Sequence, residues 1–293
     1  MPSSRRAVLA AMAAGALAGC AGPARTRDGA SASGRPGAGT GSGTPSRTPR
    51  TAGSAAAPAV TRADIVARYG RLKPRTWGFD APGVVHELPT TRRVIALTFD
   101  ACGGPGGSGY DRKLIDFLRR REIPATLFLN SRWIDANPAI FRRLAAEPLF
   151  EIANHGTRHR PLSVTGRSAY GIAGTRNAGE VYDEVAGNHV KLSRLLGAPP
   201  RFFRSGTAYC DDVAARIVTD LGERFAGFTV NGDAGATFTP EEVRRTVTAA
   251  RGGSMVICHM NQPTGGTARG IAAAVPHLLA SGYHFVRLSD ELH

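Results

Sequence analysis

The chain has 293 residues, enough for one large domain or two small ones, and it carries a formal net charge of +14. Such an excess suits an anionic surface such as a cell wall or lipid headgroups, although an arginine-rich composition without a dedicated partner gives the same charge. The folded part contains no run of basic residues interleaved with aromatic side chains, so we predict no nucleic-acid partner.

Residues 1–19 have the pattern of a cleaved export signal. A basic start precedes an apolar stretch over residues 7–17, shorter than the ~20 residues that a membrane-spanning helix needs. The segment SRRAVL at residues 4–9 resembles a twin-arginine signal, and the LAGC that ends at Cys20 resembles the bacterial lipobox. We therefore expect an extracytoplasmic lipoprotein anchored to the cell membrane through lipidated Cys20. A soluble secreted protein with a chance cysteine at the cleavage site is the alternative.

The next segments differ in composition. Residues 20–60 consist mainly of Gly, Ser, Ala, Thr, Pro and Arg, which cannot bury enough surface to offset the entropy of ordering, so we expect a disordered tether. Residues 61–91 are expected to extend the main domain at its N-terminus, with a helix over 61–70 and a strand over 83–88. The main domain is expected to occupy residues 92–293.

From residue 94 onward, apolar runs of strand length alternate with helical patterns. The predicted strands span residues 94–99, 125–129, 150–153, 201–203, 225–230, 254–258 and 284–288. The predicted helices span residues 110–121, 138–146, 180–196, 212–221, 240–250 and 267–280. This alternation predicts an α/β fold with about seven strands in a parallel sheet, open or closed.

Polar residues stand at the ends of five of these strands: Asp100, His155, Arg204, Asn231 and His259. Catalytic groups of parallel α/β barrels come from the C-terminal ends of the strands, where the connecting loops converge. Five polar residues at one rim are difficult to explain by packing, and we predict that this rim is the functional site.

The two histidines of the segment HGTRH, His155 and His159, are four residues apart. On a helical turn, this spacing places both imidazoles on one face, where they can share a metal ion. Two ordinary loop histidines are the alternative. Asp100 is followed by a glycine-rich loop at residues 103–107 and not by an immediate helix, which makes a helix-capping role less suitable for it.

Several motifs together resemble the NodB-type polysaccharide deacetylases of carbohydrate esterase family four. They are TFD at 98–100, HGTRH at 155–159, RSGTAY at 204–209, Asp233 and ICH at 257–259, in the family's order. The resemblance covers about residues 92–290. It implies a distorted (β/α) barrel that hydrolyses acetyl groups of chitin-like, peptidoglycan or xylan polymers with zinc or another divalent ion.

The resemblance also implies roles for the polar residues. Asp100 would be the general base, with Arg204 beside it to keep the carboxylate ionised. His259 would be the general acid, held protonated by Asp233. A backbone N–H near Tyr209 would help to bind the oxyanion. His155 and His159 would be metal ligands.

The sequence departs from the family pattern at three places. Ala101 stands where the family has a second Asp, its third metal ligand; residues 205–206 lack the family's Pro; and residues 232–235 lack its Trp. Cys102 shares strand parity with Asp100, so its thiolate is a candidate third ligand, as is Asp100 itself. A small buried cysteine without a metal is the alternative.

The remaining cysteines and histidines match no motif. Cys102, Cys210 and Cys258 permit three single disulfides, of which we expect Cys102–Cys210, and Cys258 should point into the helix layer. Surface positions are expected for His86, His189, His277, His284 and His293.

The sequence thus predicts a metal-dependent hydrolase that removes N-acetyl groups from an envelope glycan. We expect peptidoglycan as the substrate, or a chitin-like polymer, and zinc as the ion. Two alternatives remain. One is a non-catalytic glycan-binding lipoprotein on the same barrel, and the other is a hydrolase of small cyclic amides or imides.

Overall fold

The computed structural model describes residues 58–293, so the predicted export signal, Cys20 and nearly all of the predicted tether lie outside the described residues. The strands are β1 Trp77–Gly78, β2 Val84–Val85, β3 Val94–Ala101, β4 Ala125–Leu129, β5 Phe150–Asn154, β6 Phe202–Phe203, β7 Cys210–Asp211, β8 Arg224–Ala226, β9 Val230–Asn231, β10 Met255–His259 and β11 His284–Val286. The helices are α1 Arg62–Tyr69, α2 Arg112–Arg120, α3 Ser131–Ala136, α4 Pro138–Ala145, α5 Ala178–Leu196, α6 Asp212–Asp220, α7 Pro240–Thr248 and α8 Thr267–Ala280, with a 3₁₀ turn η1 at Leu288–Asp290.

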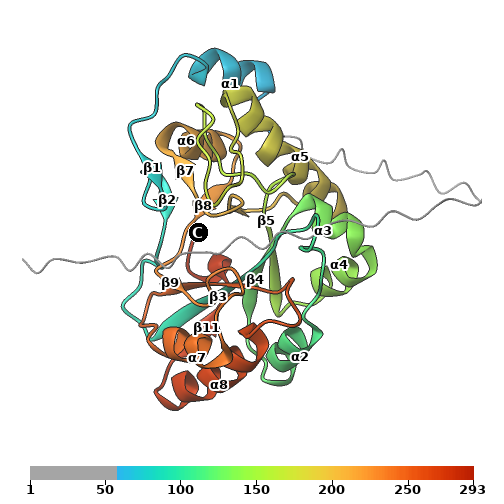
Figure 1. The fold of residues 1–293 in the computed structure, drawn as a ribbon, viewed down its shortest axis with the longest axis vertical. Helices are drawn as coiled ribbons and strands as arrows, with labels where there is room; N and C mark the ends of the chain where they lie inside the picture. Colours follow the sequence, from blue (N-terminus) through green and yellow to red (C-terminus); the bar gives the residue numbers. More distant parts are fainter. Residues whose placement is uncertain (1–57) are drawn as a thin grey trace, which may run out of the picture. The chain divides into compact units, whose positions relative to one another are not determined.

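Nine of the strands form one parallel sheet in the order β2-β8-β6-β5-β4-β3-β10-β9, with β11 paired to the start of β3 (Figure 1). The order ends at β2 and β9, which do not pair, so the barrel is open. The prediction of a distorted barrel of parallel strands is confirmed as a half-barrel, with more strands than the seven expected.

The apolar run at residues 225–230, predicted as one strand, forms two strands at different places in the sheet. β8 pairs with β2 and β6 near one edge, whereas β9 pairs with β10 at the other. Between them, the N–H of Gly227 donates to the carbonyl of Val85 (2.7 Å) and that of Thr229 to the carbonyl of Met255 (2.9 Å). This segment therefore links the two edges of the open barrel.

The helices lie around the outside of the strands (Figure 1). Asp111 and Asp211 begin α2 and α6, because their carboxylates accept the N–H groups of Leu114 (3.1 Å) and Ala214 (2.8 Å). The helix α3 was not predicted; Asn130 caps it directly after β4. Among the described residues, no helix combines the length and apolar character needed to cross a bilayer.

Side chains of β3 alternate between two buried clusters. The odd-numbered residues 95–101 pack beneath the outer helices with residues such as Leu114 and Ile271. Val94 and Ala96 instead belong to a cluster on the inner face of the sheet with Phe128 and Phe202. Because side chains alternate along a strand, Asp100 ends the inner row, while Ala101 is buried in the outer cluster.

The N-terminal extension packs onto this domain. A capping box joins Thr61 and Asp64 at the start of α1, and Arg62 forms an ion pair with Asp183 of α5 (3.0 Å). Farther along, β1 pairs with β7 in a separate two-stranded antiparallel sheet that was not predicted. The expected helix is confirmed as α1, and the expected strand is the shorter β2.

Candidate functional site

The end of β3 places a buried carboxylate at the rim of the barrel. Asp100 is 2% exposed, and its Oδ1 accepts a hydrogen bond from Nη1 of Arg204 (2.8 Å). Burial alone raises the pKa of Asp100, but the Arg204 guanidinium and the imidazoles of His155 and His259 together lower it. The carboxylate is therefore ionised over the physiological pH range.

Arg204 is held in one orientation by the strands around it. It is completely buried, its Nη1 also donates to Oγ1 of Thr98 (2.9 Å), and its other nitrogens donate to the carbonyls of Ala226 (3.1 Å) and Gly227 (2.9 Å). The guanidinium lies over the ring of Phe128, 4.1 Å from the centroid. These contacts fix the cation against Asp100, as predicted.

A second charged pair consists of His259, at the end of the neighbouring strand β10, and Asp233. His259 is the register partner of Asp100, so both side chains stand side by side on one face of the sheet. Nδ1 of His259 lies 2.9 Å from Oδ1 of Asp233, whose Oδ2 accepts from the backbone N–H of His259 (2.6 Å) and the hydroxyl of Thr267 (2.8 Å). Against the opposing effect of burial, the Asp233 carboxylate raises the pKa of His259 well above its ordinary value. His259 is therefore poised as a proton donor.

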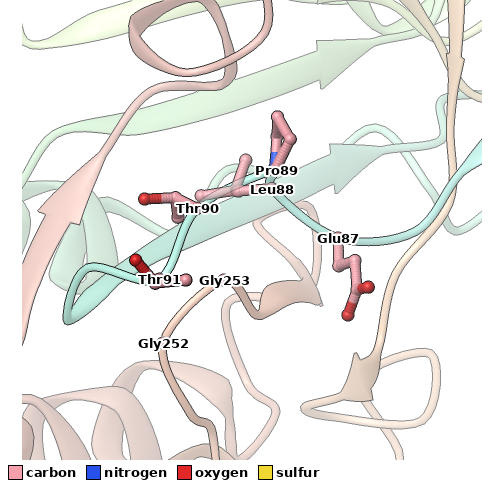
Figure 2. A pocket seen from close by; sticks show the side chains of 7 residues that line it. All are labelled: Glu87, Leu88, Pro89, Thr90, Thr91, Gly252 and Gly253. Carbon is pink, nitrogen blue, oxygen red and sulfur yellow. The ribbon is translucent and has the colours of Figure 1, made fainter.

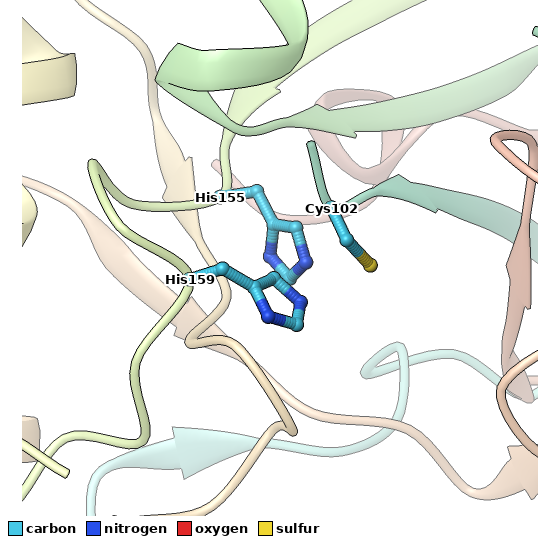
Figure 3. A group of neighbouring side chains, drawn as sticks. All are labelled: Cys102, His155 and His159. Carbon is cyan, nitrogen blue, oxygen red and sulfur yellow. The ribbon is translucent and has the colours of Figure 1, made fainter. Parts of the chain in front are cut away.

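Three potential metal ligands lie close together (Figure 3). The Sγ of Cys102 and ring nitrogens of His155 and His159 all lie within 4.8 Å of one another. The two imidazole centroids are 4.9 Å apart. Asp100 is not part of this group: its Oδ1 pairs with Arg204, and its Oδ2 lies 3.6 Å from Nε2 of His155.

The helical turn expected for the two histidines is wrong. Residues 155–160 form an irregular loop in which Gly156 (φ 76°) and His159 (φ 61°) have left-handed backbone conformations. The rings meet through this irregular backbone and not through helical periodicity. Glycine adopts this conformation without strain, whereas at His159 the surrounding structure must enforce it.

The residues present fit a divalent cation. Nδ1 of His155 donates to the carbonyl of Arg204 (2.9 Å) in the neutral tautomer that leaves Nε2 as an acceptor, and this buried Nε2 has no hydrogen-bond partner among the described residues. Burial raises the pKa of the Cys102 thiol, but the neighbouring imidazoles of His159, His155 and His259 outweigh it and bring the pKa well below its ordinary value. A thiolate and two imidazoles form a ligand set that suits zinc and leaves a position open.

A buried carboxylate that the sequence analysis did not identify, Glu184, binds the backbone of the loop that carries His155 and His159. Glu184 of α5 is 3% exposed, and its oxygens accept the backbone N–H groups of Arg158 (2.9 and 3.0 Å) and Arg160 (3.2 Å). Asn130 donates from Nδ2 to the carbonyls of His155 and Gly156 (2.8 Å each). The sign in the sequence that could have revealed Glu184 is a carboxylate on the apolar face of a helix, next to Val185.

A second polar layer lies deeper, around Asn154 at the end of β5. Its Oδ1 accepts from the N–H of Gly156 (2.9 Å) and from Asn188 (2.8 Å), and its Nδ2 donates to Oε1 of Glu223 (2.9 Å). His189, expected at the surface, is only 4% exposed and lies 2.8 Å from the same oxygen. That expectation was wrong because the buried Glu223 on the loop before β8 supplies His189 with a polar partner inside the core.

Other predicted residues have different outcomes. All three cysteines of residues 58–293 are free, so the expected Cys102–Cys210 disulfide is wrong: Cys210 is buried on β7 in an apolar cluster, whereas Cys102 faces the histidines. Cys258 points into the helix-covered cluster as expected. Asn231 is exposed and accepts the N–H of Ala234 (2.9 Å), which is a turn contact outside the group described above.

A hollow of about 460 Å³ lies elsewhere (Figure 2). It is lined by residues 87–91 with Gly252 and Gly253, and the N–H of Gly253 donates to the carbonyl of Val94 at the start of β3. The hollow therefore sits at the opposite end of the strands from Asp100. Glu87 is its one charged side chain, so it offers no set of converging catalytic groups.

Comparisons with known proteins agree with the fold described above. Residues 87–226 match a family model described as polysaccharide deacetylase. A peptidoglycan-N-acetylglucosamine deacetylase of Bacillus cereus is 24% identical over 213 residues, covering 71% of this chain and 92% of that protein. A carbohydrate esterase family 4 pseudoenzyme of Bacillus anthracis has a similar fold, with a TM-score of 0.61, 19% identity, and coverage of 73% of this chain and 70% of that one. A family 4 acetyl xylan esterase of Clostridium thermocellum, solved with a cobalt ion, has a TM-score of 0.55, 22% identity, and coverage of 67% and 89%.

Proposed function

We propose that this chain, which belongs to the polysaccharide deacetylase family through residues 87–226, hydrolyses N-acetyl groups of an envelope glycan. The observation that carries the proposal is the register pairing of Asp100 with His259 on adjacent strands. It sets an ionised carboxylate and a protonated imidazole side by side, next to three potential metal ligands.

Cys102, His155 and His159 would hold the metal ion, with zinc as the ion best matched to sulfur and nitrogen donors. The thiolate would replace the third ligand that Ala101 cannot supply. When bound, a divalent ion supplies a Lewis acid that polarises the acetamide carbonyl and makes water a stronger nucleophile. Because the carbonyl of Arg204 accepts from Nδ1, Nε2 of His155 is the nitrogen that would hold the ion.

The protein's own residues manage the protons. Asp100 accepts a proton from water as the new C–O bond forms, and Arg204 keeps the carboxylate ionised until then. His259 donates its proton to the nitrogen as the C–N bond breaks, releasing acetate and a free amine. Asp233 stabilises the imidazolium before the transfer. Each proton transfer contributes about 10²–10⁴-fold in rate.

The loop after β6 would assist with the oxyanion. The N–H of Tyr209 reaches Oγ1 of Thr207 only at 3.4 Å, which is a long hydrogen bond and leaves this donor available for a stronger acceptor. Gly206 in the same loop approaches the backbone of His159 so closely that a Cβ there would clash. This contact brings the donor to the metal-binding loop.

Peptidoglycan is the proposed substrate. The Bacillus cereus relative is named for its action on N-acetylglucosamine of this polymer. The lipobox at Cys20 and the polar segment that follows would tether the domain to the cell membrane, within reach of the wall. Peptidoglycan is therefore the N-acetylated polymer nearest to the domain, with chitin-like glycans as the alternative.

A glycan-binding protein without activity is the second candidate, favoured by Ala101 in place of a carboxylate ligand. The buried Asp233–His259 pair argues against it, because binding alone requires no matched acid and base. A hydrolase of small cyclic amides is the third candidate, and its activity would be confined to small molecules.

Acetate release and metal analysis test the proposal. The full chain, purified without chelator, is expected to contain about one equivalent of divalent metal and to release acetate from peptidoglycan or chitooligosaccharides. Asp100→Asn should retain the metal and lose the activity. Equal rates for the two proteins would contradict the role of Asp100. Bound metal without release from any polymer would favour the binding protein or the cyclic-amide hydrolase.

A further inference from the structure

Next to the site lies a set of aromatic side chains that the proposed chemistry does not use. Tyr209 is at its centre, with ring centroids 4.2 Å from Phe79, 5.7 Å from Trp77 and 5.5 Å from Tyr170. Phe228 adjoins Phe79 at 5.3 Å. We call these five residues the aromatic cluster. None of them is fully buried, so the cluster is a surface and not a piece of core.

Part of the aromatic cluster comes from the N-terminal extension. Trp77 lies on β1, whose register partner on β7 is Asp211, and the carboxylate of Asp212 accepts the N–H groups of Arg75 (2.8 Å) and Thr76 (3.0 Å). Both Trp77 and Phe79 precede residue 87, where the match to the family model begins. The extension thus adds aromatic surface to the family domain at a fixed position.

Tyr170 is presented to solvent by a strained turn. Ala169 and Ile172 exchange both backbone hydrogen bonds (3.2 and 2.9 Å), and the two residues between them, Tyr170 (φ 50°) and Gly171 (φ 74°), are left-handed. Asn or Gly normally occupies the first of these positions, because a bulky side chain there is costly. Tyr170 is nevertheless 61% exposed, with its ring edge-on to Tyr209. Backbone strain of this kind clusters at active sites and ligand-binding positions.

The aromatic cluster is continuous with the catalytic site. The carbonyl of Tyr209 accepts from the N–H of Leu162 (3.1 Å), just after the metal-binding loop, and from the hydroxyl of Ser205 (2.9 Å), just after Arg204. The backbone of Tyr209 is thereby fastened to both halves of the site. A ligand on its ring would lie beside the reacting group.

We propose that the aromatic cluster binds a pyranose ring of the substrate glycan, next to the sugar that carries the reacting acetamide. The faces of Trp77, Tyr170 and Tyr209 provide apolar area for the C–H face of a sugar, and the two phenols provide hydroxyl groups for its rim. The exposed Arg167, whose guanidinium lies 5.2 Å from the Trp77 ring, adds a cation for an anionic substituent. The inference deepens the proposed function and rests on it, because the occupant is that same glycan.

Oligosaccharides of two lengths test this subsite in the metal-loaded full chain carrying Asp100→Asn, which does not consume the ligand. N-acetylchitobiose and N-acetylchitopentaose are the probes, and calorimetry gives both dissociation constants. We expect the pentaose to bind more tightly, and Tyr170→Ala to reduce the ratio of the two affinities by about tenfold. Leu195→Ala, which removes a 46% exposed apolar side chain from α5, is the matched control and should keep the ratio.

Tryptophan fluorescence adds a readout of position. The chain has two tryptophans, of which Trp133 is fully buried and Trp77 half-buried. The pentaose should change the emission of the parent protein and not that of its Trp77→Phe variant.

The outcomes separate the subsite from the reaction. An affinity ratio that is the same with and without Tyr170, or an emission change that persists in Trp77→Phe, overturns the subsite. Acetate release by the wild-type chain without length-dependent binding also overturns it and leaves the proposed function standing. Length-dependent binding that requires Tyr170, without any acetate release, supports the subsite and contradicts the proposed function.

Discussion

The two halves of the site are positioned in different ways. Asp100 and His259 end adjacent strands and are register partners, so the sheet itself fixes the base beside the acid. His155 and His159 lie on an irregular loop with left-handed residues, and side chains from α5 and the residue before α3 hold that loop in place. The acid–base half depends on strand pairing, whereas the metal half depends on buried polar contacts.

This difference determines which changes each half tolerates. A side chain at a strand end keeps its position when a neighbour is replaced, because the backbone ladder remains. A loop held by Glu184 and Asn130 loses its shape when one of these acceptors or donors is removed. Substitutions in the acid–base half should therefore change the rate of the reaction. Substitutions in the metal half should change the affinity for the metal.

The largest effect should come from Asp233→Asn. Since the Asp233 carboxylate raises the pKa of His259, its loss lowers that pKa, and the acid is then deprotonated at a lower pH. The alkaline limb of the profile of kcat against pH should move to lower pH, with a loss of about 10²–10⁴-fold above neutrality. Zinc content should stay unchanged, because Asp233 is not one of the proposed metal ligands. An unshifted alkaline limb would show that another group is the acid.

Cys102→Ser tests the metal half directly. A serine hydroxyl is a far poorer zinc ligand than a thiolate, so the affinity should fall by more than the ~100-fold that loss of an outer partner costs. Cobalt substitution gives a readout independent of activity: the thiolate-to-cobalt charge-transfer absorption should be present in the wild type and absent in the variant. Cys258→Ser, which alters a cysteine on the outer face of β10, should keep the band. Absorption that survives in Cys102→Ser would remove Cys102 from the ligand set.

Glu184→Gln sharpens the comparison, because it touches no proposed ligand side chain. The amide leaves backbone N–H groups of Arg158 and Arg160 without their carboxylate, at a cost of about 1–3 kcal/mol in stability. We expect zinc affinity to fall about 10- to 100-fold, while the pH profile keeps its shape. Asp183→Asn, at the neighbouring position with a 53% exposed side chain, is the matched control and should retain full affinity. Equal zinc affinities in both variants would show that the loop keeps its shape without the Glu184 carboxylate.

The strand-held half was accessible from the sequence, because long apolar runs mark buried strands and the polar residue after each run marks the rim. Parity along β3 also placed Cys102 on the side of Asp100. The family motifs added the roles of Asp233 and Arg204, and the ion pairs of these residues with His259 and Asp100 are present.

The loop-held half was accessible only in part. The spacing of His155 and His159 indicated a shared ion, but it was interpreted with helical periodicity, and the left-handed residues of the loop leave no periodic signal. Its supports are single polar residues on otherwise apolar faces, such as Glu184. Which buried partner such a residue meets depends on tertiary packing, and the same limit made His189 appear to be a surface residue.

The smallest effect is expected in the deep polar layer, with Glu223→Gln. Burial, only partly opposed by His189 and Asn154, raises the pKa of Glu223 from 4.5 to about 7. Protonated Glu223 therefore makes its full contribution to stability below the unfolded pKa of 4.5. This contribution is lost as the pH rises through about 7. The neutral Gln variant does not share this loss, so its melting temperature relative to the wild type should rise between about pH 5 and pH 8, by about 2–4 °C for each kcal/mol.

Glu180→Gln is the control: the pKa of Glu180 is lowered by Arg176, so its difference from the wild type should stay constant over the same range. A constant difference for Glu223→Gln as well would mean that Glu223 is ionised throughout, and that the layer beneath the histidine loop is held by charge rather than by a neutral hydrogen-bond network.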